Sequence, residues 1–440
     1  MSNPNQYTVG WICAIETEYV AARCFLDKKH PHPESLLPHD NNHYTLGEIA
    51  GHNVVIAVLP DGDHGTSSAT TVARDMLHSF PNIRFGLIVG IGGGVPTRHD
   101  IRLGDVVVSS ARNGRGSVVQ YDLGKALQGK EFLKTGLLNQ PPRILRAAVS
   151  GLRAQYEEEG HQLKKSVQAV LDRNKGLRRK YSRPPRETDR LYESHFVHLD
   201  PDATCSDLCG RSRLISRSER TEDDDDPTVH YGLIASGNSV IKDAIFRDKL
   251  AAEQDVLCFE MEAAGLLNHF PCMVIQGICD YADSHENKEW QGYAAMTAAA
   301  YARDLLREIT PRRVELERNA VAILKEIGDS LDNVSNNVHN VRAITNESAK
   351  KIEDLANVIK IKELPLAEGT GFGTYVNDHE DEFLPGARRG LLQQIEERSG
   401  PSEAKRMLTG IDWQTLSITD CDQDSPEAGV DRGELLLQKR

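Results

Sequence analysis

The sequence lacks several features that would mark whole classes of protein. It has no apolar run of 18 residues, so we expect no membrane-spanning helix and no membrane partner. The chain does not open on a basic stretch followed by an apolar one, so we expect no secretory signal. Basic residues are outnumbered, 52 against 65 acidic ones, which gives a net charge of −13. This balance argues against nucleic acid as a partner, because binding it needs a basic face.

Three sequence motifs of well-known chemistry are also absent. There is no G-x-x-x-x-G-K-[ST] phosphate-binding loop, and no G-x-G-x-x-G opens a helix after a strand. No G-x-S-x-G is present, so a serine nucleophile of that type is not indicated. The chain has 8 cysteines, and most lie inside apolar runs, which is typical of reduced core cysteines in a cytoplasmic protein.

One segment, between residues 195 and 209, has the residue types of a metal site. His195, His198, Cys205 and Cys209 are spaced H-x2-H-x6-C-x3-C. Zinc accepts such ligands, but this spacing is loose and matches no strong zinc signature. A loop with incidental cysteines is the favoured interpretation, so we predict no metal and leave zinc as the alternative.

Continuous apolar strands alternate with helical stretches through most of the chain. That alternation is typical of a largely parallel sheet covered by helices on both faces. We therefore predict an α/β fold with three αβα layers and a mixed, largely parallel central sheet over residues 5–310. A polar and charged insertion interrupts it at about 156–228. The strands are expected at 7–15, 100–110, 231–236, 256–259 and 273–279, with another that starts at 85 and runs into the glycines. A hairpin is expected at 44–60 and helices at 65–78, 240–254 and 290–309.

The remaining chain changes in composition after Pro311. Apolar residues recur with heptad spacing at Leu324, Ile327, Leu331, Val334, Val338 and Val341, and again at Ile352, Leu355 and Ile359. This pattern predicts a helical segment over 311–362, either a coiled coil or one amphipathic helix lying on the domain. A connector follows at 363–400, and the tail at 401–440 is expected to be disordered.

Carboxylates stand at the ends of two apolar strands in CFEMEAAGLLNHFPCMVIQGICDYADSH, residues 258–285. Glu260 and Glu262 follow the first strand, and Asp280 ends the second. A carboxylate buried without partners is costly, and ligands of such sheets collect at the carboxyl ends of strands. These side chains are therefore candidates for ligand binding or proton transfer.

Three further stretches follow strands, and each has a structural alternative. Glu16 and Glu18 could bind a ligand or simply favour a helix N-terminus. The glycines of IGGGVP, which ends at Pro96, allow a close ligand approach or a tight turn. The 61–68 corner, DGDHGTSS, could bind an anion or simply cap a helix.

These motifs occur in an order that resembles the nucleoside phosphorylase superfamily. AIETE, GIGGGVPTRHDIRLGDVVVSS, EMEA and ICDYAD are similar to the motifs of its methylthioadenosine and S-adenosylhomocysteine nucleosidases. The chain resembles still more closely the phosphorylase-like N-terminal domains of fungal multidomain signalling proteins. There, a segment similar to residues 364–397 precedes a P-loop domain.

The resemblance implies a role for each matching residue. Asp280 would protonate the departing purine, Glu18 would activate water, and Glu262 would hold the ribose hydroxyls. The other substrate-binding residues it implies are Met261, Glu260, Gly92, Gly93, Val240, Ile241, His64 and Ser67. His64 with Arg98 or Arg102 could instead bind a phosphate.

Two departures from the family pattern bear on activity. Val240 stands where an aromatic residue usually stacks on the base, and Gln276 stands where the closest group has an arginine. The predicted function is hydrolysis of the N-glycosidic bond of a purine, favoured as adenine, nucleoside or nucleotide. No cofactor is expected, with inorganic phosphate as the alternative co-substrate, and a homo-oligomer is predicted. The alternative is an inactive signalling or oligomerisation module.

Overall fold

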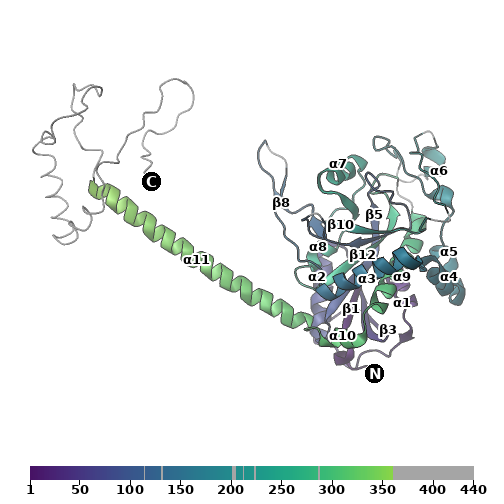
Figure 1. The fold of residues 1–440 in the computed structure, drawn as a ribbon, viewed down its shortest axis with the longest axis horizontal. Coiled ribbons are helices and arrows are strands. Elements are labelled where there is room, and N and C mark those ends of the chain that lie inside the picture. The colour runs from purple at the N-terminus through teal and green to yellow at the C-terminus, as the bar shows by residue number, and fades with distance from the viewer. Residues whose placement is uncertain are drawn as a thin grey trace, which may run out of the picture. The chain divides into compact units, whose positions relative to one another are not determined.

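The computed structural model describes residues 1–112, 114–129, 132–200, 205–211, 213–221, 224–285 and 288–359. The chain divides into two units, Met1–Asp332 and Asn333–Arg440. The first unit is a sheet with helices on both faces, as the sequence predicts (Figure 1). The predicted connector at 363–400 and tail at 401–440 lie outside the described residues.

The central sheet has ten strands in the order β11-β10-β6-β12-β5-β1-β4-β3-β2, with β7 beside β10. β1 pairs in parallel with β4 and β5, β12 with β5, and β10 with β6, β7 and β11. Four pairs are antiparallel: β2–β3, β3–β4, β12–β6 and β11–β5. The strands are β1 Val9–Cys13, β2 Lys28–Lys29, β3 Tyr44–Ile49, β4 His52–Val58, β5 Phe85–Gly94, β6 Val106–Ser109, β7 Val118–Gln120, β10 Val229–Ser236, β11 Val256–Glu260 and β12 Cys272–Asp280, with a separate pair β8 Gly124–Lys125 and β9 Leu133–Lys134.

Helix α9, Gln291–Arg307, forms the centre of one helical layer. Its alanine-rich face lies directly on β12, where a Cβ at Gly277 would sit 1.9 Å from the Ala294 carbonyl oxygen. Small residues on both sides therefore permit this close approach. Around α9 pack α1 Glu16–Cys24, α3 Arg143–Glu159, α4 Leu163–Arg173 and α5 Arg178–Tyr181. The opposite layer includes α2 Gly65–Ser79 and α8 Ala263–Leu266, which pack together, and α7 Ala244–Gln254 against β11.

The glycine-rich segment at 90–94 is strand rather than turn. The sequence suggests that a strand runs into a tight turn there, but β5 continues to Gly94. Its last two glycines pair antiparallel with Cys258 and Phe259 of β11. A Cβ at Gly92 would lie 2.7 Å from the Phe259 carbonyl oxygen, so any side chain at position 92 would prevent the close approach of β5 and β11. The glycines thus let two strand ends that carry candidate site residues meet.

The insertion is anchored to the sheet by one buried ion pair. Asp105 is fully buried and accepts hydrogen bonds from Arg220 at 2.6 Å and from the Thr228 amide at 2.9 Å. Burial alone would raise the pKa of Asp105, but the bonds from Arg220 and His230 hold it below its usual value. Removing one partner of such a pair typically costs ~3–5 kcal/mol. The aspartate of the GDVVVS motif therefore has a structural role.

The compact unit continues past residue 310, because Val314 and Ala320 are buried in the same core. The predicted helical segment forms two helices, α10 Pro311–Leu316 and α11 Ala320–Ile359. Along α11, Val341 and Ile344 are 62% and 64% exposed. None of the helices in the described ranges is long and apolar enough to cross a membrane. The short helical turns are Pro4–Gln6, Lys175–Leu177, Arg186–Thr188, α6 Cys205–Leu208 and Lys288–Trp290.

Candidate active site

Glu18 lies in the first turn of α1, directly after β1. Its side chain folds back, so that Oε2 accepts hydrogen bonds from the Ala14 and Ile15 amides at 2.6 and 3.1 Å. Oε1 accepts from the Ile91 amide of β5 at 2.9 Å. Burial, and then the negative charge of Glu262, raise the pKa of Glu18 to about 8. A buried carboxyl group with a pKa near neutrality is suited to proton transfer.

Glu262 follows β11 and faces the start of α2. Its Oε1 accepts from the Gly65 amide at 3.4 Å, and its Oε2 accepts from the Met261 amide at 3.2 Å. Burial raises the pKa of Glu262, and the nearby His64 opposes that rise. The negative charge of Glu262 contributes to the raised pKa of Glu18, so the two carboxylates are near enough to interact electrostatically.

Glu260 has a different environment from Glu262. Its Oε2 accepts from the amides of Glu262 and Ala263 at 3.0 and 2.9 Å, at the beginning of α8. Burial and the charge of Glu262 raise the pKa of Glu260 to about 7. The carboxylate therefore fixes the turn that carries Glu262, while its Oε1 has no hydrogen-bond partner among the described residues.

Asp280 ends β12 beside the glycines of β5. Its Oδ1 accepts from the Ala282 amide at 2.9 Å, and the Cys279 thiol donates to Oδ2 at 3.2 Å. Gly93 is the register partner of Asp280, and a Cβ there would lie 2.7 Å from Asp280 Oδ1. Gly93 thus leaves room on the face where the carboxylate lies.

Gln276 and Glu18 converge over another glycine of β5, Gly90. A Cβ at Gly90 would lie 2.7 Å from Glu18 Oε1 and 3.0 Å from Gln276 Oε1. Gln276 is 1% exposed, and its Oε1 has no hydrogen-bond partner within the described ranges. A neutral amide thus stands near Glu18, at the position where the resemblance leads one to expect an arginine.

The other predicted substrate-binding residues differ in how exposed their side chains are. His64 and Ser67, at the start of α2, are exposed, and Met261 is half-buried. Val240 is 64% exposed, on the loop after β10, whereas Ile241 packs against a small apolar cluster that contains Phe259.

Two residues that hold this loop were missed by sequence reasoning. The Tyr121 hydroxyl donates to the Ser239 carbonyl at 2.6 Å, and Asp122 accepts from the Asn238 amide at 2.7 Å. Asn238 in turn accepts from the Thr66 amide of α2 at 3.1 Å. No motif marks Tyr121 or Asp122, so the sequence offered no signal for them.

The arginines suggested as phosphate ligands lie in other cavities. Arg98 lines a cavity of about 540 Å³ at the first residues of β10 and the start of β11, and Arg102 lines a second one of about 750 Å³. Neither His64 nor Ser67 is among the residues that line these two cavities. Both cavities lie at the beginning of β10, whereas Glu260 and Glu262 lie at the end of β11, which runs parallel to β10.

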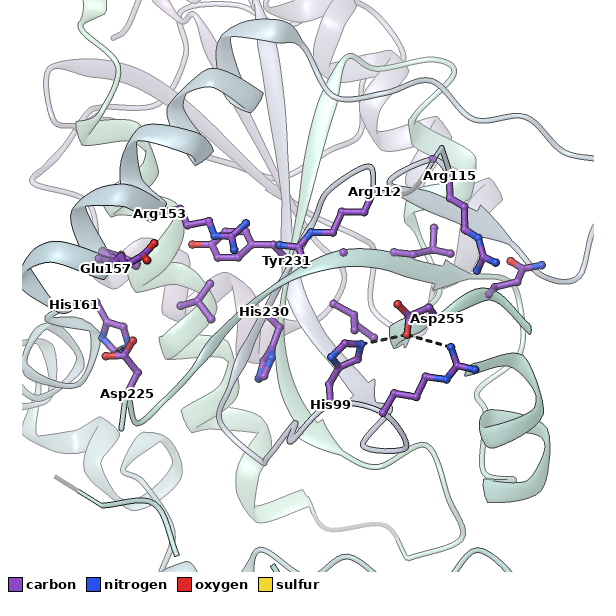
Figure 2. Close-up of a pocket in the computed structure, with 18 residues that line it drawn as sticks. His99, Arg112, Arg115, Arg153, Glu157, His161, Asp225, His230, Tyr231 and Asp255 are labelled. Atoms are coloured by element: carbon purple, nitrogen blue, oxygen red, sulfur yellow. Dashed lines mark hydrogen bonds and ion pairs between the residues drawn. The ribbon is translucent and has the colours of Figure 1, made fainter. Parts of the chain in front are cut away.

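The first cavity is basic, with arginines reaching in from separate segments (Figure 2). The Arg153 guanidinium lies 5.4 Å from the centroid of the Tyr231 ring. Partial burial, and then the positive charge of Arg153, lower the pKa of Arg112. Such a cavity suits an anion, but no predicted catalytic residue lines it.

The fold is a three-layer α/β fold in which carboxylates lie at or just after the carboxyl ends of β1, β11 and β12. The chain belongs to the phosphorylase superfamily, whose family model matches residues 8–309. It is thus an enzyme of the nucleosidase and nucleoside phosphorylase type at the level of class.

Three relatives place the chain more closely. A nucleotide-binding leucine-rich repeat (NLR)-like protein of the fungus Hyaloscypha variabilis is 46% identical over 316 residues, which cover 72% of this chain but 30% of that protein. A 5'-methylthioadenosine/S-adenosylhomocysteine nucleosidase of Mycobacterium tuberculosis is 25% identical over 68% of this chain and 96% of its own length. A death domain-containing ATP nucleosidase of Amphimedon queenslandica is 32% identical over 105 residues, 21% of this chain and 20% of that protein.

Proposed function

We propose that the protein hydrolyses the N-glycosidic bond of a purine nucleoside or nucleotide. The observation that carries this proposal is that two carboxyl groups lie against glycines of β5: Glu18, whose pKa is raised to about 8, at Gly90, and Asp280 at Gly93. Asp280 could thus protonate the departing base while Glu18 accepts a proton from the attacking water.

The proposed chemistry divides the work among the carboxylates. Asp280 donates a proton to N7 of the purine, so that the base leaves neutral while the C1′–N9 bond breaks. Glu18, as the anion, accepts a proton from the water whose oxygen forms the new bond to C1′. Glu262 accepts hydrogen bonds from the ribose hydroxyls, and Met261 packs against the sugar. These contacts favour the oxocarbenium-like transition state over the ground state.

Hydrolysis is favoured over phosphorolysis because of the charges around the site. Glu18, Glu260 and Glu262 are all buried, and each has a raised pKa. Arg98 and Arg102, the arginines considered for phosphate, line other cavities. A second anion at such a site would be repelled, whereas a neutral water would not. Water is therefore the proposed nucleophile.

Adenine is the proposed base because two of the relatives are named for adenine-containing substrates, methylthioadenosine and ATP.

A substrate panel tests the proposal. Purified protein is incubated with adenosine, inosine, methylthioadenosine, AMP and ATP, with and without inorganic phosphate, and free base is measured by chromatography. We expect base from at least one adenine compound in phosphate-free buffer. Base that appears only with phosphate would show that phosphate, not water, is the nucleophile. No base from any compound would reject cleavage for this panel.

Self-association through α11 is a second proposed role, and it is compatible with the first. Two residues of the predicted heptad segment, Val341 and Ile344, leave apolar side chains 62% and 64% exposed. Exposed apolar positions on a long helix are typical of surfaces that pair with another helix.

Replacing both residues tests this role. We expect the full chain to sediment as an oligomer and the double variant Val341→Lys/Ile344→Lys to sediment as a smaller species. The double variant Arg342→Lys/Lys350→Arg keeps the charges of the same helix and serves as the control. Equal sedimentation of the wild type and the apolar-to-lysine variant would remove this role from α11.

A further inference from the structure

The insertion brings together a group of metal-ligating side chains away from the carboxylate site. Cys205 begins α6 and Cys209 directly follows its last residue, and the Cys209 amide donates to the Cys205 carbonyl at 3.1 Å. Positions four apart on a helical turn lie on one face, so the two thiols are neighbours. Both are free cysteines.

His198, from the loop before α6, completes a set of three. Its Nδ1 lies 3.0 Å from Cys209 Sγ and 3.7 Å from Cys205 Sγ, and all three atoms are within 4.8 Å of one another. Tetrahedral zinc with its usual bond lengths separates sulfur and nitrogen ligands by about 3.6 Å and two sulfurs by about 3.8 Å. The cluster therefore has the dimensions of a zinc site. His195, the other histidine considered from the sequence, is exposed and outside the group.

His285 is the candidate for a fourth ligand, although its ring nitrogens lie outside the set of three atoms within 4.8 Å. Its side chain is 2% exposed, and neither ring nitrogen has a hydrogen-bond partner in the part of the chain that the structure describes. The ring stacks on Tyr192 at 4.1 Å and lies 5.9 Å from the His198 ring, centroid to centroid. Its Nδ1 lies 3.6 Å from Asp283 Oδ1, which is too long for a hydrogen bond. A buried imidazole without hydrogen bonds is costly, and a metal bond would satisfy one of its nitrogens.

We propose that His198, Cys205 and Cys209 bind a structural Zn²⁺ ion, with His285 as the fourth ligand. Zinc binds both cysteines as thiolates, so their two protons are released to solvent as the zinc–sulfur bonds form. Without the ion, burial and the neighbouring Cys209 raise the pKa of Cys205 to about 11, so the thiol form prevails. A dication reverses that preference.

The position of the ion suggests what it stabilises. The His198 amide donates to Ser284 Oγ at 2.9 Å, and the His285 amide donates to Asp283 at 2.8 Å. Both contacts lie in the loop that follows Asp280. Zinc at this point would fasten the insertion to that loop.

Metal content is the primary test. The full-length protein, purified without chelator, is analysed for zinc by mass spectrometry, and its thiols are counted in denaturant. We expect about one zinc ion per chain, and less than about one-tenth of that in Cys205→Ser/Cys209→Ser. Cys24→Ser, a half-buried cysteine outside the group, is the matched control and should keep its zinc. A metal-free wild type, or a disulfide between Cys205 and Cys209, would overturn the proposal.

Cobalt substitution identifies the ligands. Added to protein stripped of metal, Co²⁺ should give the sulfur-to-metal charge-transfer and visible bands of tetrahedral thiolate coordination in the wild type and in Cys24→Ser. The bands should be absent in the double cysteine variant. His285→Ala should weaken zinc binding about 10- to 100-fold and shift the visible bands. Unchanged bands and affinity would exclude His285 from the ligand set. Because these measurements need no substrate, they are decided independently of the proposed reaction.

Discussion

Asp280→Asn is expected to lower the rate of purine release about 10²- to 10⁴-fold, the usual contribution of a positioned general acid. Asparagine has nearly the same shape and can still accept the bond that the Ala282 amide donates to Oδ1. It cannot donate a carboxylic proton to a departing base. The loss should therefore fall on the rate and leave substrate affinity nearly unchanged. The measurement is steady-state release of base, with circular dichroism and thermal melting to confirm that the fold is retained.

Asp283→Asn is the matched control for this prediction. Asp283 lies in the same loop, but its oxygens face the His285 amide at 2.8 Å and the Arg247 guanidinium at 3.8 Å. We expect its replacement to cost less than about tenfold in rate, because those partners are structural. Equal rates for Asp280→Asn and the wild type would show that another group supplies the proton.

The rate of the wild-type enzyme is expected to rise with pH by about tenfold per unit below pH 8 while Asp280 keeps its proton, and to fall where Asp280 loses the proton that it must donate. Glu18 must be ionised to accept a proton from water, and burial together with Glu262 raises its pKa to about 8. Below that pH the protonated, inactive form prevails. The measurement is the pH profile of kcat/KM, which reports the free enzyme. Because Glu18 and Glu262 interact, the rising limb belongs to the pair.

Gln276→Arg should move this rising limb to lower pH by about one to two units. A guanidinium beside Gly90 would approach Glu18 and favour its anion, so more enzyme would be active at neutral pH. Gln276→Met, which adds no charge, should leave the limb in place. If Gln276→Arg and Gln276→Met have the same pH profile, the residue at 276 does not govern the ionisation of Glu18.

The sequence predicts much of the fold because its strands are continuous apolar runs and its helices alternate with them. The three-layer α/β fold and its largely parallel sheet are confirmed. The boundaries differ where tertiary contacts decide them. Helix α7 begins at Ala244 rather than at residue 240, because the Asp243 side chain caps it by accepting from the Ile245 and Phe246 amides. The strand β5 includes the glycines expected in a turn.

The site was harder to predict, and the reasons are physical. Strand-end carboxylates are visible in the sequence, because a buried strand that ends in an acidic residue is unusual. The contact between Glu18 and Gln276 depends on the missing side chain of Gly90, and three segments far apart in the chain create it. The convergence of His198 with Cys205 and Cys209 likewise depends on how an irregular loop folds, which spacing alone did not indicate. The roles of these residues remain predictions.

The central claim is that this carboxylate site cleaves a purine N-glycosidic bond with water. Its most direct test is one incubation of the wild type and Asp280→Asn with the preferred adenine compound in phosphate-free buffer, with base and sugar product measured together. The account predicts equal amounts of base and free ribosyl product from the wild type, and at least about a hundredfold less of both from the variant. No base from the wild type, or base released equally by both proteins, would contradict it.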